Sequence, residues 1–227
     1  MLETTKYEKL FSTPVLRFAV PDATALNAAL LREGARLRAA GNGASKSNRG
    51  GWHSDGKLFE SDADCIEQLR SFARGAVFDA NTRIGARADP ASLDLKLSGW
   101  MNANPKGAFN APHTHPGAHW SGVYYVAQPD VETGNSGMIE FIDPRTDLPN
   151  WRILKAPAFK LKKKLRPLAG ELILFPSYLV HWVYPNEADT ERWSIAFNAT
   201  FRKAKVAKTA TSASSVANRE PVPESQL

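Results

Sequence analysis

The stretch Gly107-Ala-Phe-Asn-Ala-Pro-His113-Thr-His115-Pro-Gly-Ala-His119 contains three of the five histidines of the chain. A fourth, His181, follows far downstream in Phe175-Pro-Ser-Tyr-Leu-Val-His181-Trp-Val-Tyr184. Residues two apart in a β-strand point to the same face, so His113 and His115 could hold one ion from a single strand. A histidine on a second strand would complete the set, and imidazole suits first-row transition metals. The stretch therefore predicts a metal centre inside a β-barrel.

The sequence around this stretch is typical of short strands. Apolar runs separated by Gly, Pro, Asn and Asp indicate them. They are expected at Leu95–Asn102, His113–His115, Ser121–Val126, Met138–Ile142, Glu171–Phe175, Val180–Tyr184 and Trp193–Phe201. Short strands preceded by helices favour an antiparallel barrel or sandwich that helices brace.

Two helices are expected in the first third of the chain. The first begins after Pro21-Asp22 and stops at Gly41, with Leu26, Leu30 and Leu37 on one face. The second begins near Ser61-Asp-Ala-Asp64, and its predicted buried stripe comprises Ile66, Leu69, Ala73, Val77 and Ala80. Residues 41–57, rich in Gly, Ser and Asn, form a long loop between them, which is either a lid over substrate or a tight turn under an aromatic cap.

Size and composition favour one domain. With 227 residues and 43% hydrophobic content, the chain can bury a sizeable core. We expect a domain over 1–203, with 1–92 as helical and loop support and 93–203 as the β core, followed by a disordered tail over 204–227. No apolar stretch approaches the roughly 20 residues that a membrane span needs. The start lacks the pattern of a signal peptide, and the single cysteine fits a reducing compartment, so we expect a cytoplasmic protein.

The net charge of +6 raises the possibility of nucleic-acid binding. Much of the excess lies in Lys160-Leu-Lys-Lys-Lys-Leu-Arg166 and in the tail after Arg202. Aromatic residues are not interleaved with these basic clusters, so the stacking surfaces of single-strand binders are missing. A solvated edge strand and a frayed tail explain the charge better than a nucleic-acid partner.

A carboxylate anchor is predicted beyond the last histidine. Arg192 and Ser194 alternate on a predicted strand and therefore point the same way. An arginine fork matches a carboxylate bidentately, and a serine hydroxyl can add a further bond. The alternative for Arg192 is an ordinary ion pair with Glu187 or Glu191.

Several longer blocks resemble one known family. They are Ser47-Asn-Arg-Gly-Gly-Trp-His-Ser54, Trp100-Met-Asn102, Phe109–Gly117, Trp120-Ser-Gly-Val-Tyr-Tyr-Val126, Phe141-Ile-Asp-Pro-Arg145, Phe175-Pro-Ser177 and Arg192–Asn198. Together they look like the Fe(II)/2-oxoglutarate-dependent oxygenases, and in particular a bacterial and phage subgroup of unassigned substrate. The resemblance covers about residues 45 to 200 and extends more distantly to prolyl hydroxylases. It implies a mainly β fold, a jelly-roll or cupin-like double-stranded β-helix braced by N-terminal helices.

The resemblance also implies roles for individual residues. His113 would be the first metal ligand and His181 the distal one, while Arg192, Ser194 and Tyr125 would hold the far carboxylate of 2-oxoglutarate. The usual set has a carboxylate at the second position, where this chain has His115, so the resemblance implies a three-histidine catalytic metal site. Alternatively, His115 is the first ligand and Gly117 stands at the carboxylate position.

The implied activity is an iron dioxygenase, an oxidoreductase that uses Fe(II) and the co-substrate 2-oxoglutarate to hydroxylate a C–H bond. The substrate, a small molecule or a protein side chain, and the oligomeric state are not identified. A cupin-type metal-binding protein or isomerase without oxoglutarate chemistry is the main alternative, and a basic nucleic-acid module with a structural metal is another. His53 and His119 are expected to be ordinary packed or surface residues. The aromatic residues expected in the core are Trp100, Trp120, Phe141 and Trp193.

Overall fold

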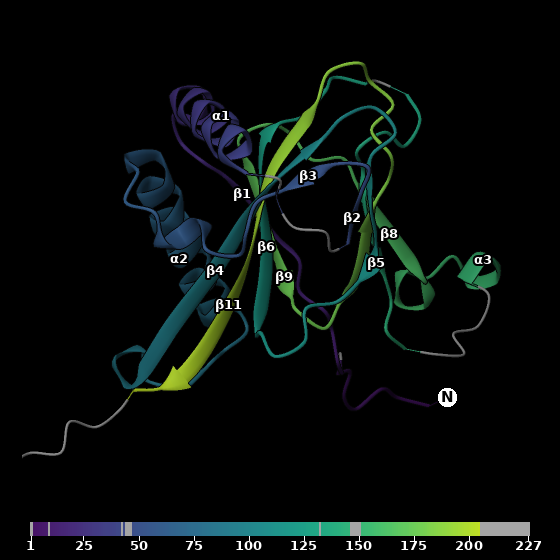
Figure 1. Ribbon diagram of the computed structural model, residues 1–227. Helices are drawn as coiled ribbons and strands as arrows, with labels where there is room; N and C mark the ends of the chain where they lie inside the picture. The colour runs from purple at the N-terminus through teal and green to yellow at the C-terminus, as the bar shows by residue number, and fades with distance from the viewer. Residues whose placement is uncertain are drawn as a thin grey trace, which may run out of the picture.

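Two antiparallel sheets face each other, and two long helices cover the outer side of the larger sheet (Figure 1). The structure, a computed structural model, describes residues 2–8, 10–41, 43, 47–131, 133–145 and 151–204. The arrangement is the predicted double-stranded β-helix braced by N-terminal helices.

The larger sheet has six strands in the order β1-β9-β6-β11-β4-β3. Their bounds are β1 Leu16–Ala19, β9 Glu171–Pro176, β6 Trp120–Ala127, β11 Arg192–Lys203, β4 Leu93–Asn104 and β3 Trp52–His53. The long strands β4 and β11 pair over their whole length, from Arg192 opposite Asn104 to Lys203 opposite Leu93. These two paired twelve-residue strands carry part of the candidate site described below.

The smaller sheet has five strands in the order β2-β5-β10-β7-β8. Their bounds are β2 Asn48–Arg49, β5 Phe109–His113, β10 Val180–Val183, β7 Ile139–Ile142 and β8 Lys162–Leu165. A short helix, α3 (Trp151–Leu154), and three 3-10 turns at Leu58–Glu60, Pro90–Ser92 and Pro157–Phe159 complete the described elements. The basic segment 160–166 contains β8 at the sheet edge, which confirms the predicted solvated edge strand.

The two helices follow the predicted pattern. Helix α1 (Ala23–Ala40) buries Leu26 and Leu30, while Leu37 packs half-buried against the same core. Helix α2 (Asp64–Arg83) buries every residue of its predicted stripe. Two hydrogen bonds fix the helices to strand β6, from Tyr124 to Asn27 and from Trp120 to Asn81. Apolar residues at helical spacing therefore fill the space between the helices and the larger sheet.

A second apolar cluster lies between the sheets and supports the site from one end. It comprises Tyr125, Ile139, Phe141, Ile173, Phe175, Leu179 and Val183. Trp120, Phe141 and Trp193 are buried as predicted, whereas Trp100 is half-buried and borders the cavity described below.

The predicted strand His113–His115 is wrong. The strand runs from Phe109 to His113, and His115 lies in the turn that follows. Gly117 has a positive φ of 85°, which bends the chain away from the sheet two residues after His115. Strands β1, β2 and β3 were not predicted; β2 and β3 have two residues each, too few for a period-two pattern.

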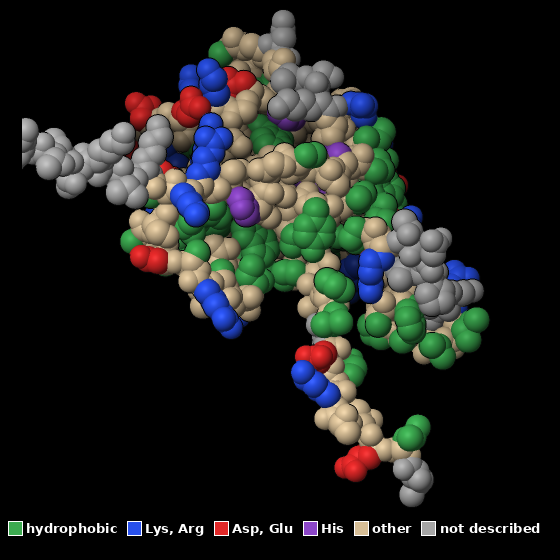
Figure 2. All heavy atoms as spheres, turned by 90° about the horizontal axis from the view of Figure 1, so that it is seen from below, with side chains coloured by type: hydrophobic (Ala, Val, Ile, Leu, Met, Phe, Trp, Pro, Cys, Tyr) green, Lys and Arg blue, Asp and Glu red, His purple; other side chains and the backbone are tan. Residues whose placement is uncertain are grey.

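The N-terminal segment extends away from the domain (Figures 1 and 2). Its exposed apolar side chains are Leu2, Tyr7, Leu10 and Phe11. On the face shown in Figure 2, Lys and Arg side chains are dispersed among hydrophobic and acidic ones. Among the described residues, no helix has the length and apolarity needed to cross a membrane. Apart from residue 204, the predicted tail 204–227 lies outside the described residues.

Candidate metal centre

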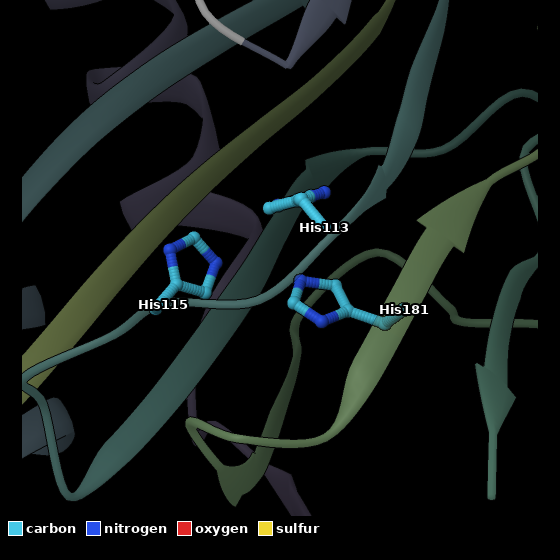
Figure 3. A group of neighbouring side chains, drawn as sticks. All are labelled: His113, His115 and His181. Atoms are coloured by element: carbon cyan, nitrogen blue, oxygen red, sulfur yellow. The ribbon is translucent and has the colours of Figure 1, made fainter. Parts of the chain in front are cut away.

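His113, His115 and His181 converge in the space between the sheets (Figure 3). One potential ligand atom from each residue lies within 4.8 Å of the others, a spacing that could hold one metal ion. The ring centroids of His113 and His181 are 4.3 Å apart, and that of His115 lies 4.8 Å and 5.2 Å from them. The structure thus brings together the three histidines that the sequence singled out.

Strand pairing positions two of the three. His113 ends β5 and lies directly opposite His181 of β10. The Nδ1 atom of His113 is 2.7 Å from the Ala111 carbonyl oxygen, and that of His181 is 2.9 Å from the Leu179 carbonyl oxygen. A carbonyl oxygen only accepts, so in each ring Nδ1 carries the proton and Nε2 keeps the lone pair that binds a metal.

Burial keeps both of these imidazoles neutral. Desolvation and the neighbouring His113 lower the pKa of His181 to about 3, and desolvation lowers the pKa of His113. Neutral imidazole is the form that ligates metals. The pair is therefore ready to bind an ion at neutral pH without first losing protons.

The third histidine is positioned by a turn. The backbone N–H of His115 donates to the Ser177 carbonyl oxygen at 3.0 Å, which ties the turn to the end of β9. The ring centroid of His115 lies 5.6 Å from that of Trp100. The Trp100 ring in turn stacks on the His53 ring, with a centroid distance of 5.6 Å and an interplanar angle of 14°. His115 reaches the centre from a third direction, as Figure 3 shows.

Arg192, Ser194 and Tyr125 line the same cavity as the three histidines. Ser194 pairs with Tyr125 of β6 on one side and with Asn102 of β4 on the other. All three predicted anchor residues are buried, with Arg192 only 2% exposed. The sequence prediction that Arg192 and Ser194 share a face is therefore confirmed.

The guanidinium of Arg192 has no carboxylate partner in the described part of the chain. Its Nη2 donates to the amide oxygens of Asn104 and Asn110 at 2.8 Å and 2.9 Å. Its Nε and the Tyr125 hydroxyl are buried without a hydrogen-bond partner among the described atoms. The alternative ion pair with Glu187 or Glu191 is wrong: among the described residues Arg192 bonds only to the two asparagines, and the Glu191 carboxylate binds Arg38 on the surface.

Electrostatics favour an anion at this position. Burial lowers the pKa of Arg192, but an arginine keeps its charge in proteins. Burial raises the pKa of the Tyr125 phenol, so its hydroxyl remains a donor at neutral pH. A buried cation and an unpaired phenol donor facing one cavity match the acceptor oxygens of a carboxylate.

The other candidate residues, His119, Gly117 and His53, do not belong to the histidine group. His119 accepts a hydrogen bond from the Phe201 backbone and lines a groove on the far side of the turn. Gly117 lines that groove and does not border the cavity of the three histidines, which gives the alternative with Gly117 at the ligand position no support. His53 is a packed residue, 2% exposed.

Sequence reasoning missed the asparagines that surround Arg192. Asn102 and Asn104 are two residues apart near the end of strand β4, a spacing that places both side chains on one face of the sheet. That spacing could have indicated a polar patch beside Arg192. The other hydrogen-bond acceptor of Arg192, Asn110, lies on a different strand, β5.

Comparison with known proteins agrees with this geometry. Residues 98–198 match a family described as "Putative 2OG-Fe(II) oxygenase". The match begins within β4 and ends within β11, and it includes the three histidines of the group and Arg192. It indicates an enzyme of the 2-oxoglutarate- and Fe(II)-dependent oxygenase type. None of the curated proteins searched matches the chain.

Solved structures show the same fold at low identity. A prolyl-4-hydroxylase from Pseudomonas putida aligns with a TM-score of 0.59 and 19% identity, over 84% of this chain and 94% of that one. A prolyl hydroxylase from Trichoplax adhaerens, bound to a peptide fragment of hypoxia inducible factor, aligns with a TM-score of 0.59 and 16% identity, over 82% and 83%. HygX from Streptomyces hygroscopicus, with nickel and 2-oxoglutarate bound, aligns with a TM-score of 0.53 and 15% identity, over 83% of each chain.

Proposed function

We propose that this chain is a non-haem hydroxylase in which His113, His115 and His181 hold Fe(II). Arg192, Ser194 and Tyr125 bind the far carboxylate of 2-oxoglutarate in the same proposal. The observation that carries it is the fully buried Arg192, which has no carboxylate partner among the described residues and shares one cavity with the histidine group.

The donor set fits this metal and this co-substrate. Imidazole suits Fe(II), and sites that activate oxygen leave positions on the ion open. Three neutral ligands leave the double charge of the ion uncompensated, and Arg192 adds a further positive charge. A dicarboxylate that chelates the ion at one end and reaches Arg192 at the other would neutralise both.

The protein residues have separate tasks in this proposal. When bound, Fe(II) supplies the oxidative decarboxylation of 2-oxoglutarate by oxygen, coupled to hydroxylation of a C–H bond. Arg192 and Ser194 orient the oxo acid, and the Tyr125 hydroxyl donates to the same carboxylate. The apolar side chains of Phe175, Ile139 and Val183 border the cavity and restrict water there.

Metal and co-substrate titration tests the proposal. We expect the purified chain to bind about one Fe(II) or Mn(II) ion, and 2-oxoglutarate to tighten metal binding and raise the melting temperature. With iron and oxygen, succinate should form when candidate substrates are added. Metal binding that 2-oxoglutarate leaves unchanged, together with an unchanged melting temperature, would favour the cupin alternative.

The substrate class and location complete the proposal. The aligned structures include one bound to a peptide fragment and one bound to hygromycin B, so both a protein side chain and a small molecule should enter the first substrate screens. Cys65 is a free thiol, which supports the proposed cytoplasmic location.

A further inference from the structure

The Arg192 anchor is tied to a distant segment through two asparagine side chains. Arg192 donates to the Asn104 amide oxygen at 2.8 Å, and the Asn104 amide nitrogen donates to the Asn48 amide oxygen at 2.9 Å. Asn48 in turn donates to the Trp52 carbonyl oxygen at 3.0 Å. A continuous row of hydrogen bonds thus connects the cavity to residues 47–53.

Residues 47–53 bridge the two sheets at the edge of the cavity. Strand β2 pairs with β5 of the smaller sheet, with Asn48 opposite Asn110. Strand β3 pairs with β4 of the larger sheet, with Trp52 opposite Ala103. Ser47 at the start of the segment lines the cavity itself. We call residues 47–53 the bridging segment.

Gly51, within this segment, lies close to the side chains of Asn48 and Asn104. A Cβ atom there would lie 2.7 Å from the Asn48 amide oxygen, 2.9 Å from the Asn104 amide nitrogen and 2.7 Å from the Ala103 carbonyl oxygen. Real Cβ atoms essentially never approach so closely. A side chain at position 51 would therefore have to displace the Asn48–Asn104 hydrogen bond.

The asparagines orient Arg192 without neutralising it. Both acceptors of its Nη2 are neutral amide oxygens, and Asn104 is completely buried. An aspartate at position 104 would have nearly the same shape but would pair its charge with the guanidinium. The charge of Arg192 is thus left for a ligand.

We propose that Asn104 is a positioning residue that couples carboxylate binding at Arg192 to docking of the bridging segment against both sheets. The inference rests on the proposed function, because the carboxylate is that of 2-oxoglutarate. Coupling between two sites is reciprocal, so a change in the segment must alter co-substrate affinity, and the co-substrate must stabilise the segment.

The test titrates 2-oxoglutarate into the full-length chain loaded with Zn(II), using calorimetry. Gly51→Ala should raise the dissociation constant for 2-oxoglutarate by about tenfold, within the usual range of coupling between sites. Asn104→Asp should raise it at least as much, because it neutralises Arg192. Asn48→Ala removes the Asn48–Asn104 hydrogen bond without adding atoms at position 51. It is therefore the test variant if Gly51→Ala does not fold.

Asn198→Asp is the matched control. Asn198 lies on the same face of β11, and its amide oxygen accepts a hydrogen bond from Ser121, a bond that an aspartate can keep. This variant should bind 2-oxoglutarate within about twofold of wild type, as expected for an independent site. All variants should keep their affinity for Zn(II).

Hydrogen exchange separates positioning from simple loss of stability. In the wild type, 2-oxoglutarate should slow amide exchange in peptides that cover residues 47–53, and this protection should disappear in Asn48→Ala. A general loss of stability would instead speed exchange throughout the chain. If folded Asn48→Ala and Asn104→Asp keep the wild-type affinity for 2-oxoglutarate and the wild-type protection of residues 47–53, this inference is wrong but the proposed function stands. If the wild type fails to bind 2-oxoglutarate, the proposed function is wrong as well.

Discussion

His113 and His181 are direct partners across the antiparallel pair β5–β10, and each directs Nδ1 to the carbonyl oxygen two residues before it. The same local hydrogen bond therefore sets the ring orientation and the tautomer of both residues. Because opposite positions in a sheet are held close by the ladder, two ligands of the proposed centre are in place before any ion arrives. His115, which lies in a turn, has no such ladder.

Arg192→Ala should weaken 2-oxoglutarate binding far more than metal binding. Removing one partner of a buried charged contact costs about 2–5 kcal/mol. Arg192→Lys should restore little, because a single ammonium cannot replace a fork that bonds two amides and a carboxylate together. Calorimetry with the metal-loaded chain measures both affinities.

Arg38→Ala is the control for that experiment. Arg38 forms an exposed ion pair with Glu191, the residue next to Arg192, and lies outside the cavity. Its loss should leave 2-oxoglutarate binding unchanged. Equal losses of metal and co-substrate affinity in folded Arg192→Ala would count against an anchor role for Arg192.

Periodic patterns made much of this fold predictable. The apolar stripe of α2 extends over several helical turns, and the alternation of side-chain direction along β11 extends over several residue pairs. Helix, strand and buried face could therefore be assigned from the sequence. The alternation also placed Arg192 and Ser194 on one face.

Long-range contacts account for what the sequence could not reveal. Asn104 and Arg192 are 88 positions apart, and Asn110 reaches Arg192 from the opposite sheet. His115 was predicted to share a strand with His113, but the turn that includes Gly117 takes it out of the sheet. The three histidines still lie together, although the strand argument for His115 was wrong, because the turn brings its ring back to the same space.

Glu140→Gln should destabilise the fold in a pH-dependent way. Burial alone would raise the pKa of Glu140, but hydrogen bonds from Trp182 and Tyr184 and the nearby Lys162 hold that pKa below the ordinary value for a glutamate. A depressed pKa gives stability that is present above the unfolded value and lost as the pH falls through the folded value. We expect a loss of about 1–3 kcal/mol at pH 7 that shrinks below about pH 4.5.

Urea unfolding between pH 7 and pH 4 measures this difference. Asp189→Asn is the control, because Asp189 forms an exposed ion pair with Lys106. An equal loss for Glu140→Gln at every pH would show that the carboxylate charge contributes nothing.

Deleting residues 205–227 should leave the melting temperature nearly unchanged. The segment is poor in large apolar side chains and therefore offers little surface to bury. Calorimetry of the full and shortened chains measures the difference. A drop of more than about 5 °C would show that the segment docks on the domain.

Metal content of His115 variants tests the most unusual feature of the proposed centre. His115→Ala should lose most affinity for Fe(II), since only two ligands would remain. His119→Ala should retain the metal, because His119 lies on the far side of the turn, against Phe201. Retention of iron by His115→Ala and its loss from His119→Ala would show that the centre uses another face of this turn.

His115→Asp tests whether the site accepts the carboxylate that the family pattern has at this position. An aspartate would supply an anionic oxygen ligand, so Fe(II) binding should survive at least in part. Its side chain is shorter than that of histidine and loses the contact with Trp100, which changes the position of the ligand atom and makes activity a poor readout. Iron stoichiometry is the decisive measurement, with His115→Asn as the uncharged control of the same size. Because the added negative charge reduces the attraction of the ion for an anionic co-substrate, His115→Asp should also bind 2-oxoglutarate more weakly than wild type. Iron loss from His115→Asp equal to that from His115→Asn would mean that the imidazole itself is required, and that the centre is built for three histidines.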